Sequence, residues 1–156
     1  MNDSNFKIIT ERDSYKKTKL GSITGKIYVC LDEYYFPEKG WFDFALVVVT
    51  WWQDSTIKIF KSESKREKFM FMDGPFYISV EKGENDSLGL SFIEWSNRRI
   101  IEKTGNIKYE LLISELIKTS DDVINECKRN NWLSDDYYKC CNLNVELRSL
   151  AERNPR

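Results

Sequence analysis

The sequence predicts an α+β fold in which an antiparallel β-sheet, arranged as a meander, packs against helices. Two observations support it. Extended β-rich runs separated by turn residues dominate up to about residue 117, and the hydrophobic period then changes to that of helices. The chain has 156 residues, 41% of them hydrophobic, which is enough to form the core of a single domain over residues 1–156. We therefore expect one sheet with helices on one face.

The first forty residues read as extended segments. Phe6 to Thr10 is a short apolar strand, and Lys26 to Tyr34 is a longer one that is rich in Ile, Tyr and Val. Ser22 to Gly25 leads into the longer strand, and Pro37 and Gly40 end it.

The segment from Asp43 to Lys61 fits two structures. Apolar side chains recur at helical spacing, and Asp43 is placed to cap a first turn. The β-branched run from Val47 to Thr50 favours a strand instead. Both alternatives stay open, and we favour a buried helix because the apolar stretch and its polar tail are longer than most strands.

A hairpin turn is predicted at Asp73, Gly74 and Pro75, because glycine tolerates positive φ and proline fixes φ. The meander continues through Leu88 to Trp95 and Arg99 to Lys103. A further turn at Gly105-Asn106 then precedes a last strand from Ile107 to Ile117, whose apolar residues alternate.

Two short helices are predicted at the C-terminus. The first begins at Thr119 or Ser120 and runs to about Asn131. The second is capped by Ser134, carries two acids in its first turn and ends before a frayed tail at residues 154–156. Its apolar face is formed by Leu143, Leu147 and Leu150.

Charge and hydropathy argue against two classes of partner. The 24 basic residues are offset by 25 acidic ones, whereas nucleic-acid binders have a basic excess, so we expect no direct nucleic-acid binding. The N-terminal residues lack the features of a secretory signal, and the longest apolar run, Phe44 to Trp52, is shorter than the ~20 residues of a membrane span. We expect no membrane association and a cytoplasmic location.

The chain contains no histidine, which excludes catalytic triads and metal sites that depend on this residue. Its four cysteines lack the CxxC spacing of zinc sites, and we expect them to pack in the core. No cofactor motif is present. We therefore expect no catalytic residues, no metal site and no cofactor. The four cysteines are Cys30, Cys127, Cys140 and Cys141.

Two clusters are candidates for binding a protein partner. Trp51 and Trp52 diverge by about 100° on a helix and face opposite sides on a strand, so one belongs to the core and the other lies near the surface. The start of the last helix combines acids and aromatics that would suit a basic partner. These residues are Asp135, Asp136, Tyr137 and Tyr138.

Two alternative functions remain open. A carboxylate-dependent enzyme, with or without a metal ion, would use acids from a set of four and requires at least two of them to converge in one cleft. An adaptor or structural binding domain would show an exposed apolar patch but would have no toxin encoded beside it. The four acids are Asp32, Glu33, Asp43 and Asp73.

The central block carries a family resemblance. Its motifs are Phe36-Pro37-Glu38, Trp41-x-Asp43-Phe44, the valine-rich run into Trp51-Trp52, and the stretch from Phe71 to Phe76. Over residues 36–80 the chain resembles bacterial immunity proteins of polymorphic-toxin and contact-dependent growth inhibition systems. The resemblance implies a cytoplasmic protein that binds and neutralises its cognate toxin by occlusion, without catalysis. The toxin-facing residues of such proteins differ between members, so none is carried over.

Overall fold

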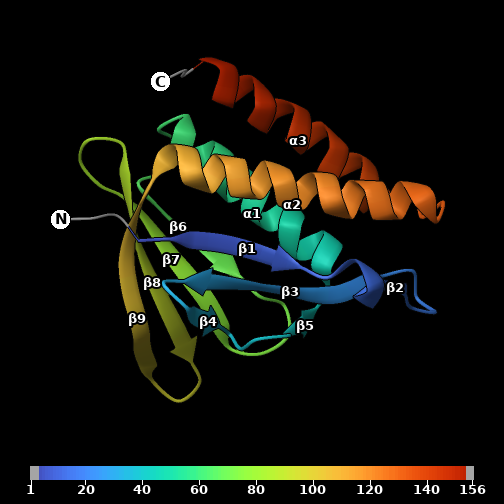
Figure 1. Cartoon of the computed structure of the whole chain (residues 1–156), viewed down its shortest axis with the longest axis horizontal. Helices are drawn as coiled ribbons and strands as arrows, with labels where there is room; N and C mark the ends of the chain where they lie inside the picture. The colour runs from blue at the N-terminus through green and yellow to red at the C-terminus, as the bar shows by residue number, and fades with distance from the viewer. Residues whose placement is uncertain (1–3, 154–156) are drawn as a thin grey trace.

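Three helices lie on one side of two antiparallel sheets in the computed structural model, which describes residues 4–153 (Figure 1). The α+β prediction is confirmed, and so is the placement of two helices at the C-terminal end. The single predicted sheet is in fact two sheets.

The first sheet is built around one long strand, β3. Its buried side chains alternate with less buried ones at its start, where Ile23 and Ile27 face the core. The predicted strand from Lys26 to Tyr34 ends early because Asp32 and Glu33 adopt φ of 49° and 72°, which turns the chain directly into the next strand. The sheet consists of β1 (Phe6–Thr10), β2 (Lys16–Lys17), β3 (Ile23–Leu31), β4 (Tyr34–Phe36) and β5 (Phe42–Asp43), and the 3-10 helix η1 (Arg12–Ser14) joins β1 to β2.

The second sheet is the predicted meander, with its strands paired in chain order. The hairpin at Asp73, Gly74 and Pro75 is confirmed, and Gly74 has φ of 93°. The predicted turn at Gly105-Asn106 is wrong. Gly105 lies inside the last strand, where a Cβ atom would stand 2.7 Å from a Leu31 side chain of the first sheet. The strands are β6 (Arg66–Met70), β7 (Phe76–Lys82), β8 (Ser87–Trp95) and β9 (Arg99–Lys108).

The segment from Asp43 to Lys61, which the sequence allowed to be a helix or a strand, forms the helix α1 (Ala45–Phe60). This is the alternative favoured from the sequence. Trp52 is fully buried, its Nε1 donates to the Met70 carbonyl at 2.9 Å, and its ring stacks on Phe69 with centroids 5.7 Å apart. Packing of this kind outweighs the strand preference of the valine run. Asp43 does not cap the helix, because Phe44 occupies the N-cap position.

The strand predicted from Ile107 to Ile117 is wrong beyond Lys108, because helix α2 (Tyr109–Arg129) begins at the next residue. The helix start predicted at Thr119 or Ser120 is therefore also wrong. The buried side chains of α2 follow helical spacing. The Thr119 and Ser120 hydroxyls donate to carbonyl groups one turn earlier, so both residues lie in the helix interior. The residues buried along α2 include Tyr109, Leu112, Ile113, Leu116, Ser120 and Val123.

The last helix, α3 (Asp135–Arg153), begins where the sequence predicts. The Tyr137 N–H donates to Ser134 Oγ at 3.2 Å, which confirms Ser134 as its cap. Leu147 and Leu150 are buried and Leu143 is partly buried, as expected. With 21 and 19 residues, α2 and α3 are long rather than short. The predicted frayed tail lies outside the described residues.

Aromatic and polar contacts tie these layers together. Phe36 of the first sheet stacks on Phe92 of the second, with ring centroids 4.8 Å apart. The buried Gln53 amide of α1 donates to Ser120 Oγ of α2 at 2.9 Å and to the Cys140 carbonyl of α3 at 3.1 Å. One side chain thus fixes the three helices relative to one another.

Candidate partner-binding surfaces

Trp51 and Trp52 diverge as predicted. Trp52 is fully buried on the core-facing side of α1, whereas Trp51 is 37% exposed. Trp52 is therefore not part of any surface, and only Trp51 remains a candidate for contacting a partner.

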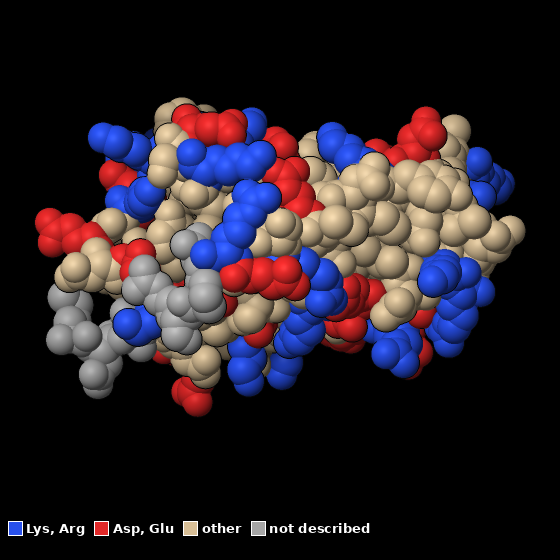
Figure 2. Space-filling model, turned by 90° about the horizontal axis from the view of Figure 1, so that it is seen from above, with Lys and Arg blue, Asp and Glu red and all other residues tan. Residues whose placement is uncertain are grey.

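The candidate residues at the start of α3 also divide into exposed and buried ones. Asp135, Asp136 and Tyr138 are exposed, but Tyr137 is buried and packs against Tyr138 with ring centroids 5.0 Å apart. Tyr137 is thus a core residue and was wrongly grouped with the surface residues. Figure 2 shows that uncharged side chains gather toward the right-hand end of the molecule, over the end of α2 and the start of α3.

Asp43 is a buried carboxylate that accepts several hydrogen bonds. It is 3% exposed, and its oxygens accept from Trp41 Nε1 at 3.0 Å and from the Phe44 N–H at 2.7 Å. They also accept the N–H groups of Met72 and Asp73, each at 3.2 Å. Asp43 therefore fastens the β6–β7 turn to the start of α1, and Asp73 contributes its backbone rather than its carboxylate.

The four candidate carboxylates do not converge. Asp43 pairs with Gly25 near the start of β3, and Asp32 follows the other end of that strand. Asp32 lies seven positions after Gly25, which corresponds to about 23 Å along a strand. The Asn5 N–H donates to Asp32 and lowers the pKa of its carboxyl. Within residues 4–153 no group of three metal-ligating side chains is placed to hold a metal ion.

The buried thiols pack as expected. Cys127 and Cys140 are fully buried between helices, and this burial raises the pKa of the Cys127 thiol to about 11 and that of Cys140 to about 12. Cys30 and Cys141 are partly exposed.

The second sheet carries an apolar row that was not predicted from the sequence. Met70, Tyr77, Ile93 and Ile101 are cross-strand neighbours on β6, β7, β8 and β9. Because side chains alternate along a strand, the row lies on the face opposite to Phe69, which packs on Trp52. We call these four residues the apolar row.

The apolar row is open to solvent at its margins. Ile101 is 51% exposed, and Trp95, on the same face two residues after Ile93, is 55% exposed. A cavity of about 230 Å³ lies beside the row, and Lys68 stands over the Tyr77 ring with its Nζ 5.0 Å from the centroid. A solvated sheet face ordinarily carries polar residues, so the apolar row is a candidate contact surface.

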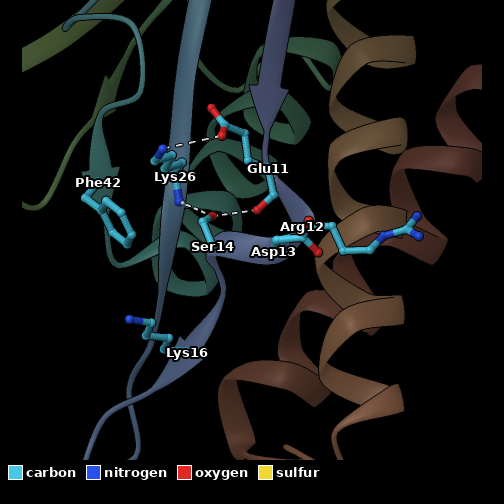
Figure 3. A pocket seen from close by; sticks show the side chains of 7 residues that line it. All are labelled: Glu11, Arg12, Asp13, Ser14, Lys16, Lys26 and Phe42. Carbon is cyan, nitrogen blue, oxygen red and sulfur yellow. Dashed lines mark hydrogen bonds and ion pairs between the residues drawn. The ribbon is translucent and has the colours of Figure 1, made fainter.

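A second pocket, of about 370 Å³, lies on the first sheet (Figure 3). Phe42, Lys26 and Lys16 line it from β5, β3 and β2, while Arg12 extends away toward α2. Lys26 pairs with Glu11 at 3.5 Å. The sequence signal that could have revealed this site is the local charge, because residues 11–26 contain five basic and two acidic residues.

Fold and surface together describe an α+β protein with exposed apolar side chains on the second sheet and exposed basic side chains on the first. Comparison with models of known protein families, with curated proteins and with solved structures finds no match. None of the helices within residues 4–153 has the length and apolar character needed to cross a membrane.

Proposed function

We propose that this chain is an immunity protein that binds a toxin domain in the cytoplasm and blocks it by occlusion, without chemistry of its own. The observation that carries the proposal is the apolar row with Trp95 beside it. The family resemblance of residues 36–80 supplies the class of partner, and the apolar row supplies a surface suited to binding it.

The energetics of the apolar row favour a protein partner. Tryptophan, tyrosine and methionine are enriched at interfaces, and an exposed tryptophan beside buried apolar neighbours is a typical binding hot spot. Tyr77 and Ile93 are already buried within the row, so a partner needs to cover only its exposed margins. Little side-chain ordering is then required on binding.

The test begins with chemical crosslinking of the tagged protein in its host, followed by identification of the captured partner by mass spectrometry. The partner is then expressed alone and together with this chain. The proposal expects growth arrest in the first case and rescue in the second. A captured partner that is harmless when expressed alone rejects the immunity function but leaves protein binding intact.

Matched variants locate the interface. Trp95→Ala should weaken binding of the purified partner about thirtyfold, because truncating a hot spot costs ~2 kcal/mol or more. Tyr138→Ala, at the surface that the sequence predicted, should change the affinity less than about threefold. The reverse result would move the interface to the start of α3 and reject the apolar row.

A further inference from the structure

We propose a second docking surface, which binds an acidic segment of a protein partner. It consists of the hairpin tip between β2 and β3 and the adjoining face of the first sheet. The tip carries Lys16, Lys17, Lys19 and Leu20, and we call these four residues the basic tip. The inference rests on the proposed protein-binding function for the class of partner, but it does not require that partner to be a toxin.

The charge of this segment is strongly local. Residues 11–26 have a net charge of +3, from five basic and two acidic residues, on a chain whose overall charge is -1. Glu11 is already engaged, because it pairs with Lys26 at 3.5 Å and accepts the Tyr28 hydroxyl at 3.0 Å. Lys16, Lys17 and Lys19 form no ion pair within residues 4–153 and remain available to external carboxylates.

Apolar side chains accompany these charges. Leu20 is 97% exposed at the end of the basic tip, and Phe42 is 44% exposed where β5 pairs with Lys26. Lys16 lies opposite Thr24, and Lys26 is two residues further along the same strand, so Lys16, Lys26 and Phe42 share one face (Figure 3). A partner that fits this face combines carboxylates with one apolar side chain.

The basic tip is held in shape before any partner binds. The Thr18 N–H donates to the Ser22 carbonyl at 2.8 Å, and the Gly21 N–H donates to the Thr18 carbonyl at 3.0 Å. Ser14 Oγ accepts the Lys26 N–H at 2.8 Å and donates to the Glu11 carbonyl, which fixes η1 beside the sheet. A preorganised loop loses little conformational entropy on binding, so its charges act at lower cost.

The composition of the face favours a protein over other anionic partners. Phe42 is the only exposed aromatic ring in the pocket, so successive nucleotide bases would find no stacking platform. One leucine is a weak anchor for a lipid surface, where stable attachment needs more buried apolar area. A protein segment with carboxylates around one apolar residue matches both the positive charge of the basic tip and its exposed apolar side chains.

The experiment titrates the isotope-labelled full chain by NMR with four ligands. They are a short peptide with glutamates around one leucine, the same peptide with glutamine for glutamate, a single-stranded oligothymidine, and vesicles containing phosphatidylserine. We expect only the acidic peptide to bind, with amide shifts confined to residues 16–26 and Phe42. Shifts spread over the molecule would reject the docking surface. Stronger binding of the oligonucleotide or the vesicles through the same residues would reject a protein partner.

The affinity of the acidic peptide for charge-reversal variants gives a quantitative test. The double variant Lys16→Glu, Lys19→Glu should weaken peptide binding about tenfold, since surface charge pairs contribute modestly and reversal adds repulsion. The matched variant Lys65→Glu, Lys128→Glu makes the same charge change at exposed positions elsewhere and should weaken it less than about twofold. Equal losses in both would attribute binding to net charge and overturn the inference. Because the peptide assay needs no toxin, its failure is distinguishable from a failure of the immunity proposal.

Discussion

Replacing Asp43 by alanine should destabilise the fold more than most surface or turn substitutions. Four N–H groups donate to this one carboxylate, at 3.0, 2.7, 3.2 and 3.2 Å. In Asp43→Ala all four lose their acceptor, and each of these bonds is partly buried. The contact between the β6–β7 turn and the start of α1 is broken by the same change.

The magnitude follows from the bond count. Hydrogen bonds to a charged acceptor contribute ~1.5–3 kcal/mol each, so four such bonds set an upper range of about 6–12 kcal/mol. Water can reach the turn once the side chain is removed and replaces part of this loss. We therefore expect Asp43→Ala to lower the free energy of unfolding by about 3–5 kcal/mol, a large share of the ~5–15 kcal/mol typical of a domain.

Urea denaturation followed by circular dichroism measures this loss, and the indole N–H resonance of Trp41 reports directly on the broken bond. The control is Asp73→Ala, whose carboxylate is exposed and makes no hydrogen bond within residues 4–153, and which should change stability by less than about 0.5 kcal/mol. A loss below about 1 kcal/mol for Asp43→Ala would refute the claim that this carboxylate holds the turn.

Two further predictions concern the core. Burial raises the pKa of the Cys127 and Cys140 thiols to about 11 and about 12, from 9.0. Since the folded state then holds these protons more tightly than the unfolded state, their stabilising contribution is complete below pH 9 and is lost as the pH rises toward 12. Urea midpoints measured across that range should fall, and less steeply in Cys140→Ala; an equal slope would contradict the assignment. Gly25→Ala places a Cβ atom 2.5 Å from the Tyr15 ring and should cost about 1–3 kcal/mol by thermal denaturation. Gly89→Ala, whose nearest neighbour is 3.8 Å away, is its control, and equal losses would rule out the clash.

Local chemistry made part of this fold predictable. The Asp73-Gly74-Pro75 turn and the Ser134 cap depend on residues within a few positions of each other, and both form as expected. The divergence of Trp51 and Trp52 follows from helix geometry alone. The sequence did not reveal which of the two is buried, because that depends on contacts with β6.

The errors arose where local patterns coincide or where distant segments meet. Ile107, Tyr109, Leu111 and Ile113 alternate like a strand, yet only Ile107 lies in β9 and the helix α2 begins at Tyr109. Gly105 looked like a turn residue, although it is required because the first sheet approaches the backbone of β9. Asp43 was expected to cap a helix because it stands just before the helical pattern. The expectation failed because the carboxylate also accepts the Asp73 N–H, thirty positions away in the hairpin turn, and the sequence gives no sign of that contact.

The apolar row shows why a surface of this kind is hidden in a sequence. An irregularity between Phe92 and Ile93 shifts the register, so that Phe92 faces Lys103 but Ile93 faces Ile101. Without that bulge Ile93 would face Glu102, and a charge would interrupt the row. Glu102 instead accepts the Tyr34 hydroxyl at 2.7 Å. A single extra residue therefore decides whether this face is polar or apolar, and neither composition nor hydrophobic period indicates where that residue lies.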